Sequence, residues 1–204
     1  MIKNPPGNDE VYQRLLSAAS ELFLDHDYAK VTTREIALRA NVNSAMIKYY
    51  FKSKLGLFDE VIRLQHEIFN NAIAQAVNSD YSVNYQKLFR HCFEIFKTQP
   101  KLAPFLVRIL VYKDGPGYHT LKGYMDEGQA LAHAMIKDSQ AKGLINPALD
   151  PDVLRVVSMS LSTYPLLIQS LLIDQLEGKD FDTFLDNLAL FSANIYQQGL
   201  APIK

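Results

Sequence analysis

The chain has 204 residues, of which 48% are hydrophobic and 21% charged, and its formal net charge is −1. A chain of this length can bury about 70% of the surface that its unfolded form exposes, so neither a disulfide nor a metal is needed for folding. The near-neutral charge excludes a wholly basic nucleic-acid binder, although an average can hide a local cluster of charge.

Composition also bears on the compartment. The single cysteine, Cys92, cannot form an intramolecular disulfide, which fits a reducing environment. The first seven residues lack the apolar core of a signal peptide. The longest apolar runs, such as residues 106–112, fall far short of the ~20 residues of a membrane span. We therefore expect a soluble cytoplasmic protein with no membrane partner.

Apolar residues recur at three- and four-residue steps along almost the whole chain, which predicts amphipathic helices. The first helix is expected from about residue 9 to 25. Thr32 and Glu35 have the spacing of a capping box at the start of a short second helix. Asn41 then interrupts the pattern, and asparagine tolerates the left-handed conformation that a tight turn often needs.

The later helices are also bounded by sequence signals. Ser44 is a candidate cap for a short helix, Gly143 is a favoured residue just past a helix end, and Asp150-Pro151 is a typical helix start. Pro165 is expected to kink the helix that contains it. The further helices are expected at residues 45–51, 54–77, 85–99, 102–110, 118–142, 151–175 and 181–198. The predicted fold class is all-α, with about nine helices.

Positive charge is concentrated in residues 30–56. Six of these 27 residues are basic and only Glu35 is acidic, so the segment carries +5 and the rest of the chain −6. The cluster coincides with two short predicted helices joined by a three-residue turn, which is the helix-turn-helix arrangement. In such a unit the second helix enters the DNA major groove and presents its N-terminal side chains to base edges.

The residue types in this segment fit that role. Ser44, Ala45 and Met46 are small or apolar residues at the start of the second helix, and Lys48 can donate to guanine or to a phosphate. Hydroxyl and cationic groups beside that helix form a predicted phosphate clamp. The candidate DNA-binding residues are Thr32, Thr33, Arg34, Asn43, Ser44, Ala45, Met46, Lys48, Tyr49, Tyr50 and Lys54.

A short basic helix pair is more often only a solvated surface, and adjacent aromatic residues such as Tyr49 and Tyr50 can equally be packing residues. Charge, turn, cap and helix pattern nevertheless coincide in this one segment, which favours DNA binding over the simpler alternative.

The same segment resembles a known family. From about Asp9 to Asn70 the chain is similar to the DNA-binding domain of TetR-type transcriptional regulators. The matching motifs are Ala18-Ala19-Ser20-Glu21-Leu22-Phe23, Thr32-Thr33-Arg34-Glu35-Ile36-Ala37, Ala40-Asn41-Val42-Asn43 and Tyr49-Tyr50-Phe51-Lys52-Ser53-Lys54-Leu55-Gly56-Leu57-Phe58.

The resemblance implies a DNA-binding domain over residues 9–70, with the helix-turn-helix at about 32–51. It places Arg34, Ser44, Ala45 and Lys48 where the family often contacts bases. It places Thr32, Tyr49, Tyr50 and Lys54 where the family contacts phosphates. The chain departs from the family pattern at Asn41, where glycine is usual, and at Lys48, where tyrosine is frequent, which leaves the base preference open.

By the same resemblance, residues 71–204 form an effector-binding and dimerisation domain. The aromatic and methionine side chains of its middle helices can line an apolar cavity, although each of them can equally be a core residue. Arg108 lies within an apolar run, where it either reaches solvent or pairs with an acidic ligand. The candidate ligand-binding residues are Phe89, Phe93, Phe96, Phe105, Arg108, Tyr112, Tyr124, Met125, Met159 and Tyr164.

The predicted helix over residues 151–175 is apolar on more than one side, so it needs burial on several faces. Together with the last helix it suits a two-fold, four-helix dimer interface, as the resemblance also implies. The candidate interface residues are Val157, Leu161, Ile168, Leu171, Leu172, Phe184, Leu188 and Phe191.

The sequence contains no recognisable catalytic constellation, metal-ligand spacing or glycine-rich phosphate loop, and we expect no enzyme activity, metal or cofactor. The hypothesis is a homodimeric transcriptional repressor that a small-molecule effector releases from operator DNA. An activator of the same family is the first alternative. A helical carrier of small molecules without DNA binding and a helical enzyme remain as alternatives from other classes.

Overall fold

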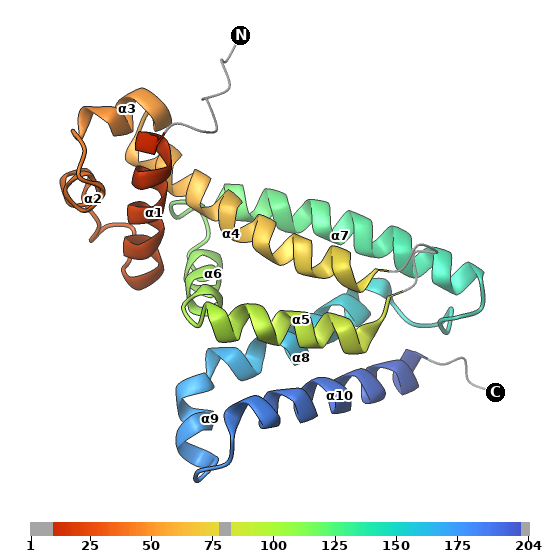
Figure 1. Ribbon diagram of the computed structural model, residues 1–204. Helices are drawn as coiled ribbons and strands as arrows, with labels where there is room; N and C mark the ends of the chain where they lie inside the picture. Colours follow the sequence, from red (N-terminus) through yellow and green to blue (C-terminus); the bar gives the residue numbers. More distant parts are fainter. Residues whose placement is uncertain (1–9, 78–82, 201–204) are drawn as a thin grey trace. The chain divides into compact units, whose positions relative to one another are not determined.

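The computed structural model describes residues 10–77 and 83–200, apart from the side chains of residues 72, 73 and 96. Within these ranges the chain forms ten α-helices and no strand, which confirms the all-α prediction (Figure 1). The helices are α1 (Glu10–Asp25), α2 (Thr33–Ala40), α3 (Ala45–Phe51), α4 (Lys54–Ala76), α5 (Tyr85–Thr98), α6 (Leu102–Val111), α7 (Tyr118–Ala141), α8 (Pro151–Leu167), α9 (Gln169–Gln175) and α10 (Phe181–Leu200).

The helices group into two compact units. The N-terminal unit comprises the described residues up to 66 together with residues 104–123, and the C-terminal unit comprises residues 67–103 and those from 124 onward. Residues 104–123, which we call the α6–α7 segment, thus pack with helices that lie much earlier in the chain. A single division near residue 70, as the sequence predicts, does not by itself place this segment in the N-terminal unit.

Helix bounds follow the sequence signals closely except at one place. The expected helix over 151–175 is two helices, α8 and α9, whose axes are bent by 66°. The expected kink at Pro165 is therefore a break, and it lies at Ile168. Proline has no N–H to donate within the helix, and the Ile168 N–H reaches Tyr164 O only at 3.4 Å. This break raises the helix count from the expected nine to ten.

The core of the N-terminal unit is dense and aromatic. Phe23 is fully buried and contacts Tyr28 and Phe58, with ring centroids 5.9 and 4.7 Å apart. Phe58 also meets the edge of Phe105 on α6 at 5.9 Å. The α6–α7 segment thus contributes an aromatic side chain to the core that α1 and α4 build.

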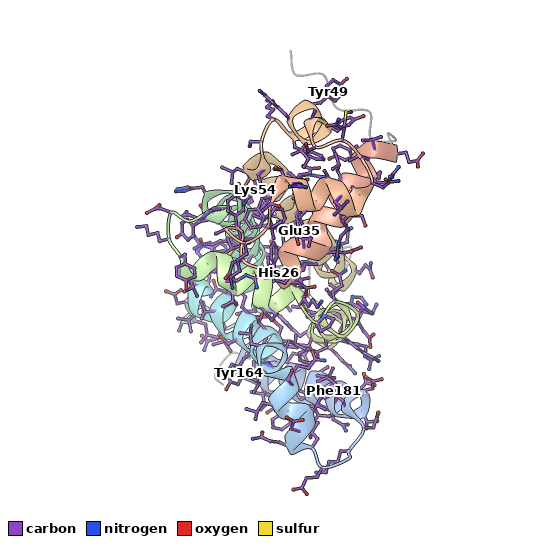
Figure 2. The ribbon with its side chains drawn as sticks, turned by 90° about the vertical axis from the view of Figure 1, so that its left-hand side faces the viewer. His26, Glu35, Tyr49, Lys54, Tyr164 and Phe181 are labelled. Atoms are coloured by element: carbon purple, nitrogen blue, oxygen red, sulfur yellow. The ribbon has the colours of Figure 1, made fainter. Side chains whose placement is uncertain are left out.

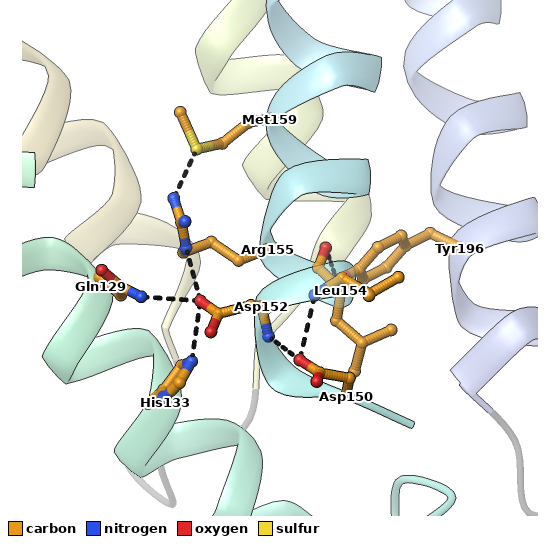
Figure 3. A network of polar contacts seen from close by, with 9 residues as sticks. Gln129, His133, Asp150, Asp152, Leu154, Arg155, Met159 and Tyr196 are labelled. Atoms are coloured by element: carbon orange, nitrogen blue, oxygen red, sulfur yellow. Dashed lines mark hydrogen bonds and ion pairs between the residues drawn. The ribbon is translucent and has the colours of Figure 1, made fainter. Parts of the chain in front are cut away.

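The core of the C-terminal unit is formed mainly by α5 against α10, with α8 beside α5. Tyr196 on α10 packs against Tyr85 at 4.7 Å and against Phe89 at 6.2 Å, and its hydroxyl donates to Leu154 O on α8 at 2.8 Å (Figure 3). One tyrosine thereby joins three helices.

No single helix among the described residues is long and apolar enough to cross a membrane. The bent pair α8 and α9 passes such a test together, by length and composition only.

Candidate nucleic-acid interface

The predicted cap and turn of the helix-turn-helix are present. Thr32 is the N-cap of α2, and its hydroxyl accepts the Glu35 N–H at 3.1 Å, as the capping box predicts. Asn41, the C-cap residue just after α2, has φ 51° and ψ 51° in the left-handed region. The Val42 N–H then donates to Ala37 O at 3.0 Å and closes the turn. Asparagine thus takes the backbone conformation for which glycine is usual.

The start of α3 differs from the expectation in one contact. Ser44 precedes the helix, but it has helical φ and ψ, and its side chain makes no capping hydrogen bond. The Asn43 side chain takes this role, because its Oδ1 accepts the Ala45 N–H at 2.8 Å. Asn43 is therefore part of the turn's own structure, whereas the Ser44 hydroxyl is exposed.

α3 is held by its inner face. Ile47 and Phe51 are buried, and Phe51 stacks on Tyr12 of α1 with centroids 4.9 Å apart. The opposite face carries Lys48 and Tyr49, both exposed, and Tyr49 projects from the unit with 76% of its surface accessible (Figure 2). The helix thus presents polar and cationic groups on a rigidly packed support.

None of the eleven candidate DNA-binding residues is buried. Four are half-buried, namely Thr33, Met46, Tyr50 and Lys54. The exposed ones are Thr32, Arg34, Asn43, Ser44, Ala45, Lys48 and Tyr49. Their direct contact with DNA remains a prediction, for which this exposure is a necessary condition.

Lys54, at the first position of α4, has a structural role that sequence reasoning missed. Its Nζ donates to Tyr28 O and to Val31 O, each at 2.7 Å, and lies 4.0 Å from the centroid of the Tyr28 ring. Burial lowers the pKa of this ammonium group from its usual value. Lys54, which the sequence predicts to bind a DNA phosphate, thus already donates hydrogen bonds to two backbone carbonyls of the α1–α2 loop.

The six basic residues of the +5 segment divide into two groups. Arg39 pairs with Glu21 at 2.8 Å, Lys30 lies 3.8 Å from Asp27, and Lys54 binds the loop carbonyls. Within the described residues no such partner is found for the other three, which are Arg34, Lys48 and Lys52. All three are exposed, and Arg34 and Lys48 are also among the candidate DNA-binding residues.

Gly56 lets α4 start close to the end of α3. A Cβ atom at this position would lie 2.1 Å from Phe51 O, a backbone atom that cannot move aside. The glycine therefore fixes the passage from the helix-turn-helix into α4, and it belongs to the motif on which the family resemblance rests.

The candidate ligand-binding residues are distributed over both units. Phe105, Arg108 and Tyr112 belong to the N-terminal unit, and Tyr112 is largely exposed, whereas Phe89 and Phe93 are buried in the C-terminal unit. The Phe96 side chain lies outside the described residues. Tyr124, Met125, Met159 and Tyr164 lie in the C-terminal unit and are half-buried or exposed. Ligand binding by any of the ten remains a prediction.

Cavities in the described part of the C-terminal unit include a small and a larger one. The smaller has about 40 Å³ and lies beside the Lys97–Asp182 ion pair. The larger has about 260 Å³ and is lined by Val83, Tyr85, Met135, Ile136, Ser139, Leu144, Ile145, Gln197 and Leu200. Among the candidates whose side chains the structure describes, Phe93 lines the smaller cavity and none lines the larger one. Helical periodicity does not indicate which apolar faces leave space between them, so the sequence did not identify this lining.

A polar cluster at the start of α8 was also missed. Asp152 Oδ1 accepts the Gln129 Nε2 amide at 2.7 Å, lies 3.0 Å from His133 Nε2 and lies 3.6 Å from Arg155 Nε (Figure 3). The Gln129 hydrogen bond, and then the His133 contact, hold the pKa of the Asp152 carboxyl below its usual value. Gln129 and His133 stand four positions apart on α7, which was the available signal.

The candidate dimer residues lie on apolar faces that the C-terminal unit leaves uncovered. Val157, Leu171 and Phe191 are exposed, Phe191 with 63% of its surface, and the other five are half-buried. Further large apolar side chains are exposed on the same helices, namely Val153, Val156, Met159, Tyr164, Leu167, Ile173, Leu190 and Ile195. Their participation in an interface remains a prediction.

Comparison with known proteins finds a family match in the N-terminal part of the chain. Residues 15–61 match the family model described as bacterial regulatory proteins, tetR family. The chain is 31% identical over 85 residues to IcaR of Staphylococcus aureus strain Newman, described as a biofilm operon HTH-type negative transcriptional regulator. Over these N-terminal residues the chain is therefore similar to the tetR family.

The similarity to IcaR covers 40% of this chain and 46% of that protein, so the match spans less than half the length of the curated relative. Solved structures extend the likeness in fold. SCO4942 from Streptomyces coelicolor has a TM-score of 0.75 at 18% identity, covering 91% of this chain and 97% of that one. A tetR-family regulatory protein from Rhodococcus RHA1 has a TM-score of 0.71 at 14% identity, covering 96% and 100%. These neighbours share the helical architecture of both units.

Proposed function

We propose that this TetR-type chain is a sequence-specific DNA-binding transcriptional regulator that acts as a repressor. One observation carries the proposal: α3 is anchored by Ile47 and Phe51 and presents Lys48 to solvent, directly after a capped and closed turn. Such a helix can enter the major groove with its N-terminal residues at the base edges. The name of IcaR, a negative regulator, favours repression over activation.

The regulator is proposed to be a homodimer, because α8, α9 and α10 expose large apolar side chains that a second copy would cover. Two-fold symmetry predicts a palindromic operator, with half-sites about 34–36 Å apart or a multiple of that spacing.

A small-molecule effector is proposed to bind the C-terminal unit and to release the operator. The 260 Å³ cavity supports this, since its volume is close to the lower end of the range of about 300–1,000 Å³ for small-molecule sites. Its lining is mainly apolar, with polar groups from Tyr85, Ser139 and Gln197. A coupling of ~1–3 kcal/mol would change operator affinity by about 5- to 150-fold, and DNA would weaken effector binding by the same factor.

The decisive experiment is selection of binding sites from a random-sequence duplex library, followed by a gel shift with the enriched duplex in excess competitor DNA. A regulator enriches a palindromic site and retains the band. A helical carrier without DNA binding, the main alternative from another class, enriches no site. An activator gives the same enrichment as a repressor, but raises rather than lowers transcription of a reporter placed behind the site.

A further inference from the structure

Arg108 on α6 binds the C-terminal end of α1. Its Nη2 donates to Phe23 O at 2.7 Å and lies 3.4 Å from Leu24 O and from His26 O. Its Nε lies 3.5 Å from Asp27 Oδ1. The last carbonyls of a helix have no partner within the helix and carry partial negative charge, so a guanidinium with several donors is well suited to this place.

Lys54 holds the segment that follows α1. Its two hydrogen bonds to Tyr28 O and Val31 O fix the chain between α1 and α2 from the side of α4. The end of α1 and the α1–α2 loop are therefore fastened by one cation from α6 and another from α4. Because the guanidinium contacts lie 82–85 positions apart in sequence, nothing local replaces Arg108.

The same helix α1 holds the helix-turn-helix at its other end. Arg14 on α1 donates to Ala40 O and, at 2.7 Å, to Asn41 O, the carbonyls at the end of α2 and in the turn. Tyr12 stacks on Phe51 of α3. α1 thus acts as a rigid link between Arg108 and the turn that orients α3.

Two further contacts fix the α6–α7 segment to α4. The Thr120 hydroxyl donates to Asp59 Oδ1 at 2.7 Å. Gly117 has φ +77° and approaches α4 so closely that a Cβ atom would lie 2.4 Å from Ile62 Cδ1. With the α6–α7 segment held in this way, the position of Arg108 relative to α1 is determined.

From these contacts we infer that Arg108 is a positioning residue for the recognition helix: through the end of α1 and the Arg14 contact with the turn, it sets the orientation of α3. The inference rests on the proposed DNA-binding function and assigns to Arg108 a part in site discrimination. Arg108 is bound to the end of α1 and is not one of the candidate DNA-binding residues, so its loss should reduce discrimination between sequences and leave phosphate binding unchanged.

The test uses the duplex selected by the wild-type chain and an unrelated duplex of equal length. We expect Arg108→Gln to weaken binding to the selected duplex about tenfold, within the about 5- to 150-fold range of couplings between separated sites. Binding to the unrelated duplex and the salt dependence should be unchanged. Arg108→Lys, which keeps a cationic donor, should restore part of the affinity. Lys113→Gln removes the same charge from the α6–α7 segment and should bind as the wild type does.

A double-mutant cycle separates positioning from simple loss of stability. If α1 relays the effect, Arg14→Gln lowers discrimination in the same way, and the double variant loses less than the product of the two single effects. All affinities are measured at a temperature at which circular dichroism shows each variant to be folded. If Arg108→Gln does not fold, the comparison with the wild type uses Arg108→Lys instead.

Three results would overturn the inference. They are wild-type discrimination in a folded Arg108 variant, an equal loss on both duplexes, and strictly additive effects in the cycle. Failure of the wild-type chain to enrich any duplex would instead contradict the proposed function, and the inference with it.

Discussion

The two units bury their apolar side chains to different extents. In the N-terminal unit, apolar residues of α1, α3 and the start of α4, such as Leu15, Ile47 and Leu57, are almost inaccessible. In the C-terminal unit, α8 buries only Leu154, Ser162 and Leu166, while Val153, Val156 and Val157 remain exposed. The contrast indicates that the first unit buries these apolar side chains within a single copy, whereas the second leaves apolar surface that a partner could cover.

The polar contacts differ in a related way. In the N-terminal unit, Arg14, Lys54 and Arg108 bind backbone carbonyls at helix ends or in loops, beside ion pairs such as Arg39–Glu21. In the C-terminal unit, the cations shown are paired mainly with carboxylates between helices, as in the Lys97–Asp182 pair at 2.7 Å. Carbonyl contacts fix the backbone itself, so the N-terminal unit is expected to hold a more exact geometry. The following predictions test this contrast, from the largest effect to the smallest.

The surplus of apolar surface is tested by Phe191→Glu and Leu171→Glu. Both side chains are exposed in the single chain, so the variants should fold but should fail to dimerise. Loss of bivalent binding should lower operator affinity by about 10²–10⁴-fold. Analytical ultracentrifugation and a gel shift give the two readouts. Leu131→Glu, at an exposed apolar position on α7, is the matched control and should remain dimeric. Dimers that survive both substitutions would place the interface elsewhere.

The completeness of the N-terminal unit is tested by Gly117→Ala. The added methyl group would meet Ile62 and Phe58 at a positive φ, so we expect a loss of about 2–4 kcal/mol in the free energy of unfolding. Gly123→Ala, in the same segment, meets no atom within 4 Å and should raise helix stability by about 0.5–1 kcal/mol. Urea unfolding followed by circular dichroism compares them. Equal stabilities would show that the α6–α7 segment is not tightly packed on α4.

The reading role of α3 is tested by Lys48→Ala. Since Lys48 is exposed and has no partner within the described residues, its loss should cost little stability but about 1–3 kcal/mol of discrimination at one base position. Repeating the site selection with the variant measures this. An unchanged site profile would exclude Lys48 from base recognition.

Lys54→Ala should act differently, because Lys54 binds the α1–α2 loop as well as lying at the predicted phosphate clamp. We expect equal weakening on all duplexes, with the slope of log affinity against log salt reduced by roughly one unit. We also expect a lower melting temperature, since Tyr28 O and Val31 O lose a charged donor. A lower melting temperature with an unchanged salt slope would leave Lys54 a purely structural residue.

The smallest expected effect concerns alkaline pH in the C-terminal unit. Burial raises the pKa of Tyr85 from 10.0 to about 12. Because the folded chain disfavours the ionised hydroxyl, keeping Tyr85 neutral adds to the free energy of unfolding. This contribution is fully present below about pH 10 and is lost as the pH rises toward 12. Tyr85→Phe should therefore make the fall in unfolding free energy between pH 9 and 11 shallower. Tyr112→Phe, at an exposed position, is the control, and identical slopes for both variants would contradict the prediction.

Much of the fold could be predicted because helix signals are local. The Thr32 cap, the left-handed Asn41 and the Asp150-Pro151 start depend on residues within one turn of each other, and the structure confirms all three. The break at Ile168 was predicted only as a kink at Pro165. A missing N–H weakens a helix locally, but how far the axis bends depends on what α8 and α9 pack against.

Less of the candidate site could be predicted in detail. The helical period of α3 already predicts that Lys48 faces outward. The hydrogen bonds of Lys54 to loop carbonyls and of Arg108 to the end of α1 depend on long-range packing instead. The sequence left Arg108 with two readings, solvent or an acidic ligand, and neither described the contacts found. The cavity beside Met135 and the Asp152 cluster were missed for the same reason.

The sequence by itself therefore determined most of the helices, the helix-turn-helix and the resemblance to the tetR family, because caps, turns and charge clusters are properties of neighbouring residues. Only the tertiary structure decided that the α6–α7 segment completes the N-terminal unit, and that α10 buries Leu185 and Ala189 while Phe191 stays exposed. Periodicity tells which side chains of a helix are apolar. It does not tell which of two apolar faces finds a partner within the chain, because that choice depends on residues many positions away.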